Sequence, residues 1–413
     1  MSRLRNKTAV ITLGLMLFQN TFALAAPIQL SLQESVNLAL QNNSTIKIAS
    51  KDKEQSEWSV SEAKAGRMPT VSLGSNYSFR NGGENSNSLK MSLPLYTGGR
   101  TEAKIDQAKL GVVSADLDVK KAQQQLVLDT TADYYSVLET KNMLAVNQET
   151  VNNLMAHQTI VQGKYDVGVV AKSDLLRAEV EVANAQQNLI KGQNQHALAV
   201  AELLNTMNID ADTEINLAEE LQYQADTRTL AEAVALAKQN RPELAKAQTA
   251  IESAAKGIEI AESGKRPSVS MSASTSWEDR LLPGNDRDWS VGVSASWNVF
   301  DAGTTKAQIN QAEISRDKAE LQAEQTQDAV ELEVRDSYLN MREAEERLKT
   351  TDVTVAKANE DLYIARERYI AGVGTNLDVI DAQLAYTQAN TNHIQALYDY
   401  NVNKAKLDKA IGL

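Results

Sequence analysis

The sequence contains no cysteine among its 413 residues and has few prolines and aromatic residues. Without cysteine, the chain forms no disulfide bond, no thiolate metal site and no lipid attachment through an N-terminal cysteine. Aromatic residues make up only 5% of the chain and prolines number six, which excludes a thick aromatic core. The abundant alanine, glutamine, asparagine and charged residues instead favour long helices that pack closely through small side chains. We therefore expect a tube or a rod.

Long apolar runs are also missing from the sequence. After the first 25 residues, no stretch approaches the ~20 apolar residues of a transmembrane helix. Residues 1–25 have a basic start, a short apolar run and small residues at Ala23 and Ala25, which is typical of a cleaved secretory signal peptide. Loss of its three basic residues changes the net charge from −12 to −15. So acidic a chain lacks the basic surface of a nucleic-acid-binding protein, and we expect no nucleic-acid partner.

The sequence repeats its own pattern. Residues 31–42 return as residues 229–240 at an offset of 198, and Pro69 returns as Pro267 at the same offset. The offset rises to 204 further along, so the second copy has gained six residues. Such a duplication predicts two structural repeats. We assign them to residues 26–228 and 229–413.

Each repeat switches from helical to strand periodicity at its proline. Between Thr70 and Phe79 apolar side chains alternate with small polar ones, and the alternation resumes at Leu89. We predict β-hairpins at residues 70–96 and 268–300, with polar loops at residues 80–88 and 278–288. Strands of this length match the ~9–11 residues with which a tilted strand crosses a bilayer. Aromatic residues near the strand ends are typical of a membrane girdle, and they are Tyr77, Phe79, Trp277 and Trp289.

A soluble sheet with one face on a core is the alternative interpretation of these strands. No other segment of the sequence offers a matching apolar sheet to cover them. Four strands cannot close into a barrel, and an open edge in lipid leaves unpaired backbone groups. The membrane interpretation therefore requires several copies of the chain.

Long helical segments follow both predicted β-hairpins. From Thr101 to Gly163, apolar residues are spaced alternately by three and four, which predicts a coiled-coil seam. We assign helical hairpins to residues 101–208 and 304–411. In each, the returning helix is too short for its partner, so a second short helix should stack on its end. The polar segment 209–228 is expected to lie outside the helices as an equatorial belt, with short helices at Ser31 and Thr229.

In this order, the features resemble the TolC family of outer-membrane efflux proteins over essentially all of the mature chain. The shared marks are the two prolines, the strand ends at residues 93–99 and 297–303, and the two hairpin tips. Each tip has a tyrosine, a glycine three residues later and an aspartate six residues beyond, as in Tyr165-Gly168-Asp174 and Tyr369-Gly372-Asp378.

The resemblance implies a fold that is mainly α with some β. Long antiparallel helical hairpins would form a tunnel in the periplasm, and four transmembrane strands per chain would form a 12-stranded barrel in a homotrimer. Such a protein is a passive exit duct in the outer membrane lipid. Its implied partners are a periplasmic adaptor (membrane fusion) protein and an inner-membrane pump or ABC exporter, in a tripartite efflux or type I secretion system.

The helical turns carry the candidate site residues. For adaptor contact we predict Val167, Gly168, Val169, Asp174, Ala371, Gly372, Val373 and Gly374. By its position Asp174 is expected to cap its helix. The resemblance places Asp378 and Asp381 at the periplasmic mouth, where symmetry would form carboxylate rings that select cations. It also assigns Asp166 to a gate tie, although Gly374 stands where some relatives carry the arginine of that tie.

Nothing in the sequence indicates catalysis. The three histidines, His157, His196 and His393, are scattered, and no phosphate-binding loop or nucleophile motif is present. We predict no enzyme activity, no cofactor and no metal site. A periplasmic adaptor and a trimeric surface adhesin are the alternatives. Adaptors lack two symmetric membrane hairpins, and an adhesin would carry its strands together at the C-terminus, where this sequence is helical.

Overall fold

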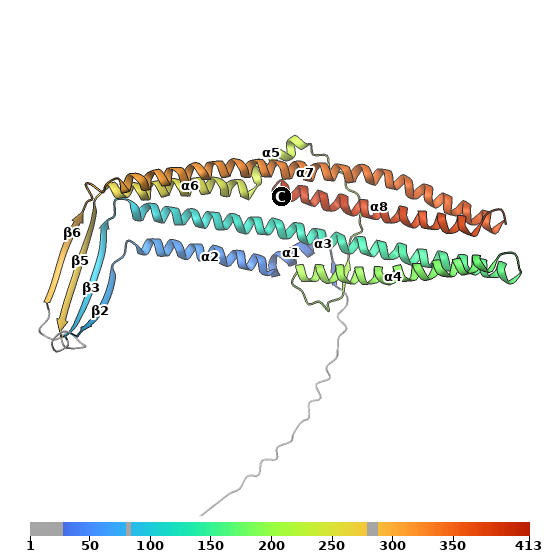
Figure 1. Cartoon of the computed structure of the whole chain (residues 1–413), viewed down its shortest axis with the longest axis horizontal. Helices are drawn as coiled ribbons and strands as arrows, with labels where there is room; N and C mark the ends of the chain where they lie inside the picture. The colour runs from blue at the N-terminus through green and yellow to red at the C-terminus, as the bar shows by residue number, and fades with distance from the viewer. Residues whose placement is uncertain (1–27, 80–83, 279–287) are drawn as a thin grey trace, which may run out of the picture.

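The computed structural model describes residues 28–79, 84–278 and 288–413 (Figure 1). The predicted signal peptide and the centres of both predicted loops lie outside these residues. The helices are α1 (Leu32–Asn42), α2 (Ser44–Ala65), α3 (Arg100–Asp166), α4 (Lys172–Thr206), α5 (Leu230–Asn240), α6 (Pro242–Glu262), α7 (Thr304–Ile370) and α8 (Asn376–Ala410), with a short 3-10 turn η1 (Ser263–Lys265). The strands are β1 (Ile28–Leu30), β2 (Thr70–Ser78), β3 (Glu84–Tyr96), β4 (Ile215–Leu217), β5 (Ser268–Glu278) and β6 (Asp288–Ser296).

Two helices of 67 residues each, α3 and α7, run the length of the helical body. At 1.5 Å per residue, each spans roughly 100 Å. Both start after a glycine with positive φ, Gly99 at 90° and Gly303 at 89°, where the chain turns sharply out of a strand. The end of α3 was predicted near Gly163, and the helix continues slightly further, to Asp166. One exposed glycine costs a helix only about 1 kcal/mol, too little to end one this long.

Shorter helices stack in pairs beside the long ones, as predicted. Figure 1 shows α2 and α4 following one another along α3, and α6 and α8 along α7. The predicted seam of α3 is confirmed, since Ile105, Ala115 and Leu126 are buried. The two hairpins therefore form one layer of helices packed through small and aliphatic side chains.

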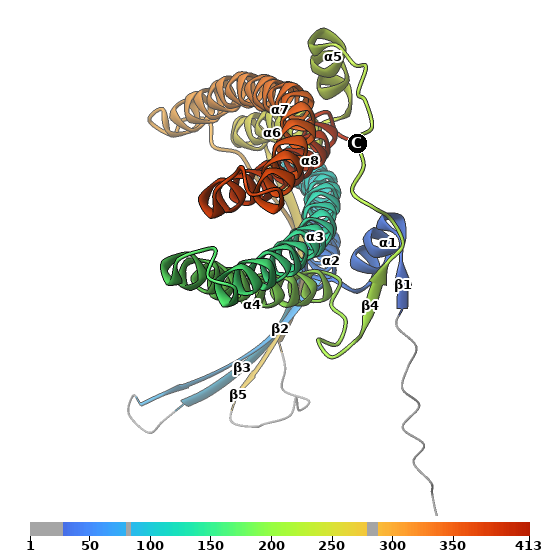
Figure 2. The same ribbon diagram turned by 90° about the vertical axis from the view of Figure 1, so that its right-hand side faces the viewer.

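The expected equatorial belt lies on one side of this layer. In Figure 2, α1, α5, β1 and β4 lie together on the same side of the long helices. Both short helices begin with a capping box, in which Ser31 pairs with Glu34 and Thr229 with Glu232. The parallel pairing of β1 with β4 was not predicted. These strands have only three residues each, too short to show a period.

The four longer strands form one antiparallel sheet in the order β2-β3-β5-β6. Both β-hairpins are confirmed, and they pair with each other through β3 and β5. Two boundaries differ from the prediction. Strand β3 already begins at Glu84, opposite Ser78, so the first loop is shorter than residues 80–88. Strand β6 ends at Ser296, opposite Ser268, where its partner β5 begins, and the Trp297 indole then donates to the carbonyl oxygen of Lys265 at 3.0 Å.

None of the helices in the described ranges is long and apolar enough to cross a membrane.

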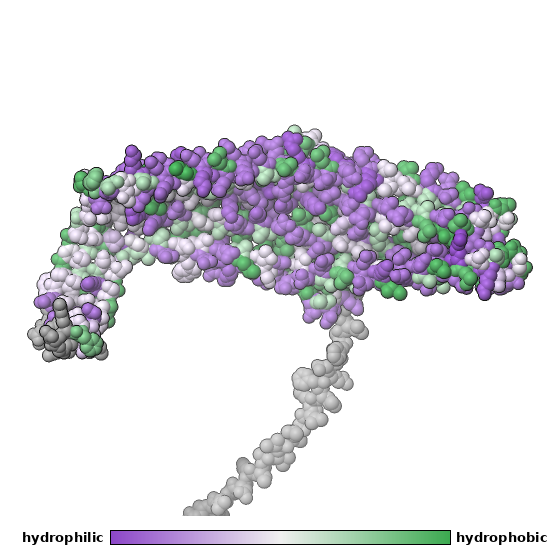
Figure 3. All heavy atoms as spheres, viewed as in Figure 1, coloured by the Kyte–Doolittle hydropathy of each residue, from purple (hydrophilic) through white to green (hydrophobic). Residues whose placement is uncertain are grey.

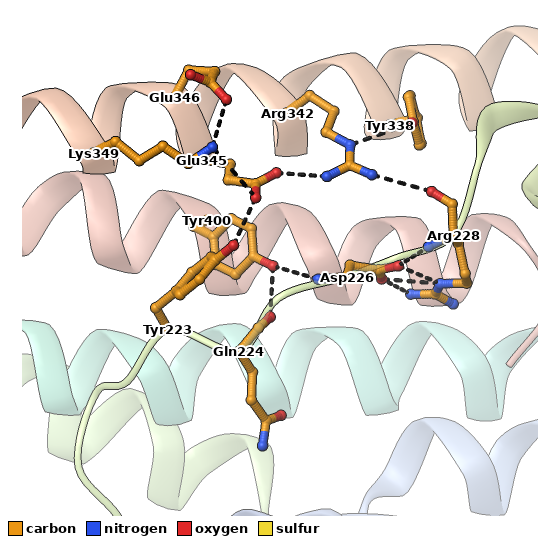
Figure 4. A network of polar contacts seen from close by, with 10 residues as sticks. All are labelled: Tyr223, Gln224, Asp226, Arg228, Tyr338, Arg342, Glu345, Glu346, Lys349 and Tyr400. Carbon is orange, nitrogen blue, oxygen red and sulfur yellow. Dashed lines mark hydrogen bonds and ion pairs between the residues drawn. The ribbon is translucent and has the colours of Figure 1, made fainter.

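A polar network fastens the segment that links the two repeats, here called the strap (residues 218–229), to α7 and α8 (Figure 4). The Tyr400 hydroxyl donates to the carbonyl oxygen of Gln224 at 2.6 Å and accepts from the Asp226 N–H at 3.1 Å. The Tyr223 hydroxyl donates to Glu345 at 2.6 Å. The strap therefore contacts both helices of the second hairpin through tyrosine hydroxyls, of which Tyr400 is buried.

Arg228 forms the charged part of this network. Its guanidinium pairs with Asp226 and also reaches Asp408 of α8 at 2.5 Å. Hydrogen bonds from Arg228 hold the pKa of the Asp226 carboxyl below its ordinary value, although burial opposes this. Asp226 is only 8% exposed, so its charge depends on this partner.

We expect Arg228→Ala to lower the unfolding free energy by about 3 kcal/mol, because it leaves a buried carboxylate without its cation. A thermal melt followed by circular dichroism measures the change. The matched control is Arg335→Ala, which removes an exposed pair with Glu331 within one helix and should cost less than about 0.5 kcal/mol. Because the pKa of Asp226 is lowered in the folded protein, the network stabilises the fold fully at pH values above the ordinary carboxyl pKa. This stabilisation is lost as the pH falls through the lowered pKa of Asp226. Equal losses in both variants would contradict the assignment.

Candidate functional site

The tips of the two helical hairpins lie together at the end of the molecule opposite the sheet (Figure 1). A buried apolar cluster joins them, with Val161 and Leu175 from the first hairpin and Leu362, Tyr369 and Val379 from the second. Both hairpins therefore end in one packed unit, and their turns form its outer surface.

The two turns have the same backbone design. Gly168 and Gly372 adopt φ of 75° and 78°, which a residue with a side chain rarely adopts. The next N–H bonds back into the helix end, from Val169 to Lys164 at 2.9 Å and from Val373 to Arg368 at 3.0 Å. The predicted contact residues outside the helices form these turns, with Val167, Gly168 and Val169 in one and Ala371, Gly372, Val373 and Gly374 in the other.

Gly374 packs directly on the end of α7. Its N–H donates to the carbonyl oxygen of Arg368 at 3.0 Å. A Cβ at this position would lie 3.1 Å from backbone atoms of Arg368 and Tyr369. A side chain here would require the turn to shift, so this turn has no room for an arginine.

Asp378 and Asp381 are exposed on one face of α8, as their spacing predicted. Asp378 also caps the helix, since its carboxylate accepts the Thr375 N–H at 2.8 Å. The Thr375 backbone N–H and hydroxyl hold the pKa of this carboxyl below its usual value. Asp378 therefore stays ionised at neutral pH.

Asp174 lies in the first turn of α4, where a carboxylate favours the positive helix end, but it makes no capping hydrogen bond. Residue Ala171 holds the N-cap position of α4, and no side chain caps this helix. Asp174 instead contributes its backbone oxygen, which accepts a hydrogen bond from the Asn376 side chain at 3.0 Å. The Asp166 carboxylate accepts from Gln162 at 2.6 Å within its own helix.

The residues that join the two tips were missed by the sequence analysis. Asn376 is buried and links α8 to both helices of the first hairpin, through Asp174 and through the imidazole of His157 at 2.7 Å. Lys164 donates to the carbonyl oxygen of Tyr369 and lies 4.1 Å from the centre of its ring. The only sequence signal for His157 was its place on a helix face that also carries Val161 and Leu154.

The structure separates the four predicted girdle aromatics. Tyr77, Phe79 and Trp289 are exposed on or beside the edge strands, and the rings of Tyr77 and Phe79 meet edge to face. Trp277 is only 6% exposed, which contradicts its place in a lipid-facing girdle. It lies on the inner strand β5, opposite Asn87 of β3.

No group of three or more histidine or carboxylate side chains within residues 28–79, 84–278 and 288–413 is placed to hold a metal ion.

A sheet of amphipathic hairpins joined to two helical hairpins with a packed common tip defines a channel protein of the outer membrane. The family model for outer membrane efflux proteins matches residues 35–209 and 233–413, that is, both repeats. The chain belongs to this outer membrane efflux protein family. Its members are channels rather than enzymes, so the chain is an efflux duct of the outer membrane, and the adaptor and adhesin alternatives fall away.

Known relatives align over most of the chain. Outer membrane protein TolC of Escherichia coli K12 is 24% identical over 428 aligned positions, which cover 92% of this chain and 83% of TolC. The toluene efflux pump outer membrane protein TtgC of Pseudomonas putida is 26% identical over 325 positions, covering 76% of this chain and 66% of TtgC.

Solved structures share the fold. A membrane protein from Pseudomonas aeruginosa superposes with a TM-score of 0.81 at 21% identity, covering 92% of this chain and 90% of that one. The MtrE outer membrane channel of Neisseria gonorrhoeae, in its open state, superposes with a TM-score of 0.77 at 18% identity. The match covers 92% of this chain and 88% of that one. The predicted fold, mainly α with a four-stranded sheet and an internal duplication, is confirmed.

We expect Gly168→Ala and Gly372→Ala each to destabilise the tips by about 1 kcal/mol, because alanine is strained at positive φ. Gly163→Ala is the matched control: this glycine is helical, and alanine there should stabilise by up to about 1 kcal/mol. An added Cβ meets no atom within 4 Å at any of the three positions, so only the backbone conformation distinguishes them. Hydrogen exchange of the tip amides measures the effect. The same sign at all three positions would contradict this account.

Proposed function

We propose that the protein is a passive exit duct that works as a homotrimer, docked to a periplasmic adaptor and an inner-membrane pump or ABC exporter. The observation that carries this proposal is a membrane-type sheet with two unpaired edges, joined to a polar helical body about 100 Å long. A sheet of this kind needs further copies to close, and helices of this length extend far beyond a membrane. Transported substrates would pass through the shared lumen without chemical change.

Barrel closure follows from the sheet edges. Strands β2 and β6 each pair on one side only within the chain. Pairing β2 of one copy with β6 of the next continues the sheet in the same direction, and three copies would give twelve strands. The apolar residues of both edge strands are exposed in the single chain, and they are Val71, Leu73, Val291 and Val293.

The helices support the same head-to-tail contact. One face of α7 carries exposed aliphatic residues that recur at intervals of 7, 11 or 14, and these are Ile314, Leu321, Leu332, Leu339, Val353 and Ile364. Such intervals keep residues on one side of a helix. On the opposite edge of the layer, α4 exposes Leu176, Val180, Ile190 and Leu198. A cyclic trimer would pack one stripe on the other and bury both.

In the trimer, Asp378 and Asp381 would each become a ring of three carboxylates at the periplasmic mouth. Rings of acids in a narrow pore attract cations and repel anions. Ionised Asp378 supports this role, although its carboxylate also caps α8.

The double variant Asp378→Ala, Asp381→Ala should lose cation selectivity and block by multivalent cations in single-channel recordings, because the charged rings are gone. Asp378→Asn with Asp381→Asn keeps hydrogen-bonding side chains and separates charge from capping. A matched control, Asp352→Ala, removes a carboxylate of α7 outside the tip. Selectivity and block that persist in both double variants would refute the assignment.

The tips suit an adaptor contact. Figure 3 shows hydrophobic residues gathered at the end of the helical body that carries the tips, whereas hydrophilic residues cover most of its length. Three exposed valines stand on the turns, and they are Val167, Val169 and Val373. An apolar patch on a rigid turn is typical of a protein docking surface.

Val169→Arg together with Val373→Arg should reduce adaptor binding at least tenfold, because two charges enter an apolar contact. Both side chains are exposed, so the trimer should still assemble, as a gel without heating can show. Binding is measured by co-purification with the adaptor from the intact envelope. Unchanged co-purification would remove the tips from the docking surface.

This proposal keeps the two structural repeats at residues 26–228 and 229–413. Residues 1–25 would direct export and then be removed. The loops at the far end of the sheet would face outside the cell.

A further inference from the structure

We propose that His157 makes the packing of the two hairpin tips sensitive to acid, so that its protonation loosens the tips and favours an open mouth. This inference rests on the proposed duct function and deepens it, because it assigns control of the mouth to one side chain. The contact of His157 with Asn376 also holds the two tips together, which Gly374 cannot do because it has no side chain.

His157 lies where three helices meet. The side chain belongs to α3 and is only 5% exposed. Its ring lies 5.0 Å from the ring of Tyr369 in α7, and its Nε2 lies 2.7 Å from Oδ1 of Asn376 in α8. A change in this residue therefore acts directly on the contact between the first and the second hairpin.

The hydrogen bonds fix which nitrogen of the neutral imidazole carries the proton. The Asn376 amide donates through Nδ2 to the carbonyl oxygen of Asp174 at 3.0 Å, which turns its Oδ1 toward His157. An amide oxygen only accepts, so Nε2 of His157 must carry the proton and donate it. In the neutral ring the unprotonated nitrogen is therefore Nδ1, and acid would add the second proton there.

The charged groups around His157 oppose that second proton. Lys164 on α3 and Arg366 on α7 are its charged neighbours, and both are cations. The carboxylates nearby, Asp174 of α4 and Glu149 of α3, act on Tyr369 and Arg366 instead. Burial lowers the pKa of His157, and the two cations lower it further, against the hydrogen bond to Asn376.

The packing between the two tips also leaves one hydrogen-bonding group unsatisfied. The Tyr369 hydroxyl is buried and has no hydrogen-bond partner within the part of the chain that the structure describes. A buried hydroxyl without a partner disfavours the packed arrangement, because water would satisfy it in a looser one. A modest added cost is therefore enough to shift the balance.

The direction of the pH effect follows from these contacts. In loosened tips His157 regains an ordinary pKa near 6.5, whereas in packed tips the pKa is lower. Packing is therefore at full strength above the ordinary pKa and weakens as the pH falls below it. Each unit of difference between the two pKa values changes the ratio of packed to loosened tips by up to about tenfold per protomer.

Because the chain has no cysteine, spin labels attach only to cysteines that are introduced at chosen positions. We would label Val169→Cys and Val373→Cys, one exposed position on each turn, and measure label distances by pulsed electron resonance in detergent. Between about pH 7.5 and about pH 5.5, the distances in this background should lengthen and broaden. His157→Gln, which keeps an N–H donor but does not titrate, should abolish the response.

The other two histidines are matched controls. His196 and His393 contact threonines of neighbouring helices, at 3.1 and 3.4 Å, and their replacement by glutamine should leave the response intact. Asn376→Asp gives a second test, because a carboxylate beside His157 favours the protonated ring. In that variant acid should tighten the tips, a reversal that loss of packing alone would not produce.

A response that persists in His157→Gln, or no response in the labelled parent, would overturn the proposal. If His157→Gln fails to assemble, the sign of the response in Asn376→Asp decides. The distance measurement needs no conduction, so it is separate from the duct function. Tips that respond to acid in a protein that forms no channel would count against the duct and not against His157.

Discussion

Hydrogen bonding at the two edges of the sheet is the constraint on which the rest of the structure depends. Among the described residues of one chain, β2 and β6 each pair on one side only, and unpaired backbone groups in lipid cost several kcal/mol each. Sharing edges between copies removes that cost and leaves no edge. The strands continue into α3 and α7 through tight glycine turns, so the symmetry of a closed sheet would be passed on to the helices.

The helical body is held most firmly at its middle. There the strap binds α7 and α8 through tyrosine hydroxyls and through the ion pair of Arg228 with Asp408. At the tips, by contrast, the contact between hairpins includes a neutral histidine beside two cations and a tyrosine hydroxyl without a partner. A well-satisfied centre and a poorly satisfied end allow the tips to move while the body keeps its shape.

Much of this architecture could be predicted from the sequence, because duplication and periodicity are properties of whole segments. The start of α7 was predicted to the residue, and both β-hairpins were found. The failures concern single contacts. Trp277 is buried although it was expected in the exposed girdle, and Asp174 makes no capping hydrogen bond. The contact from His157 to Asn376 spans 219 residues, and no local pattern reports such a pair.

The pairing of β1 with β4 brings together the two ends of the first repeat. Ile28 lies beside Ile215, although the whole first hairpin of helices and the first β-hairpin separate them along the chain. A unit whose ends adjoin can be copied in tandem with only a short connection between the copies, which here is the strap. The short parallel ladder therefore offers a physical route by which an ancestral single repeat became the present double one.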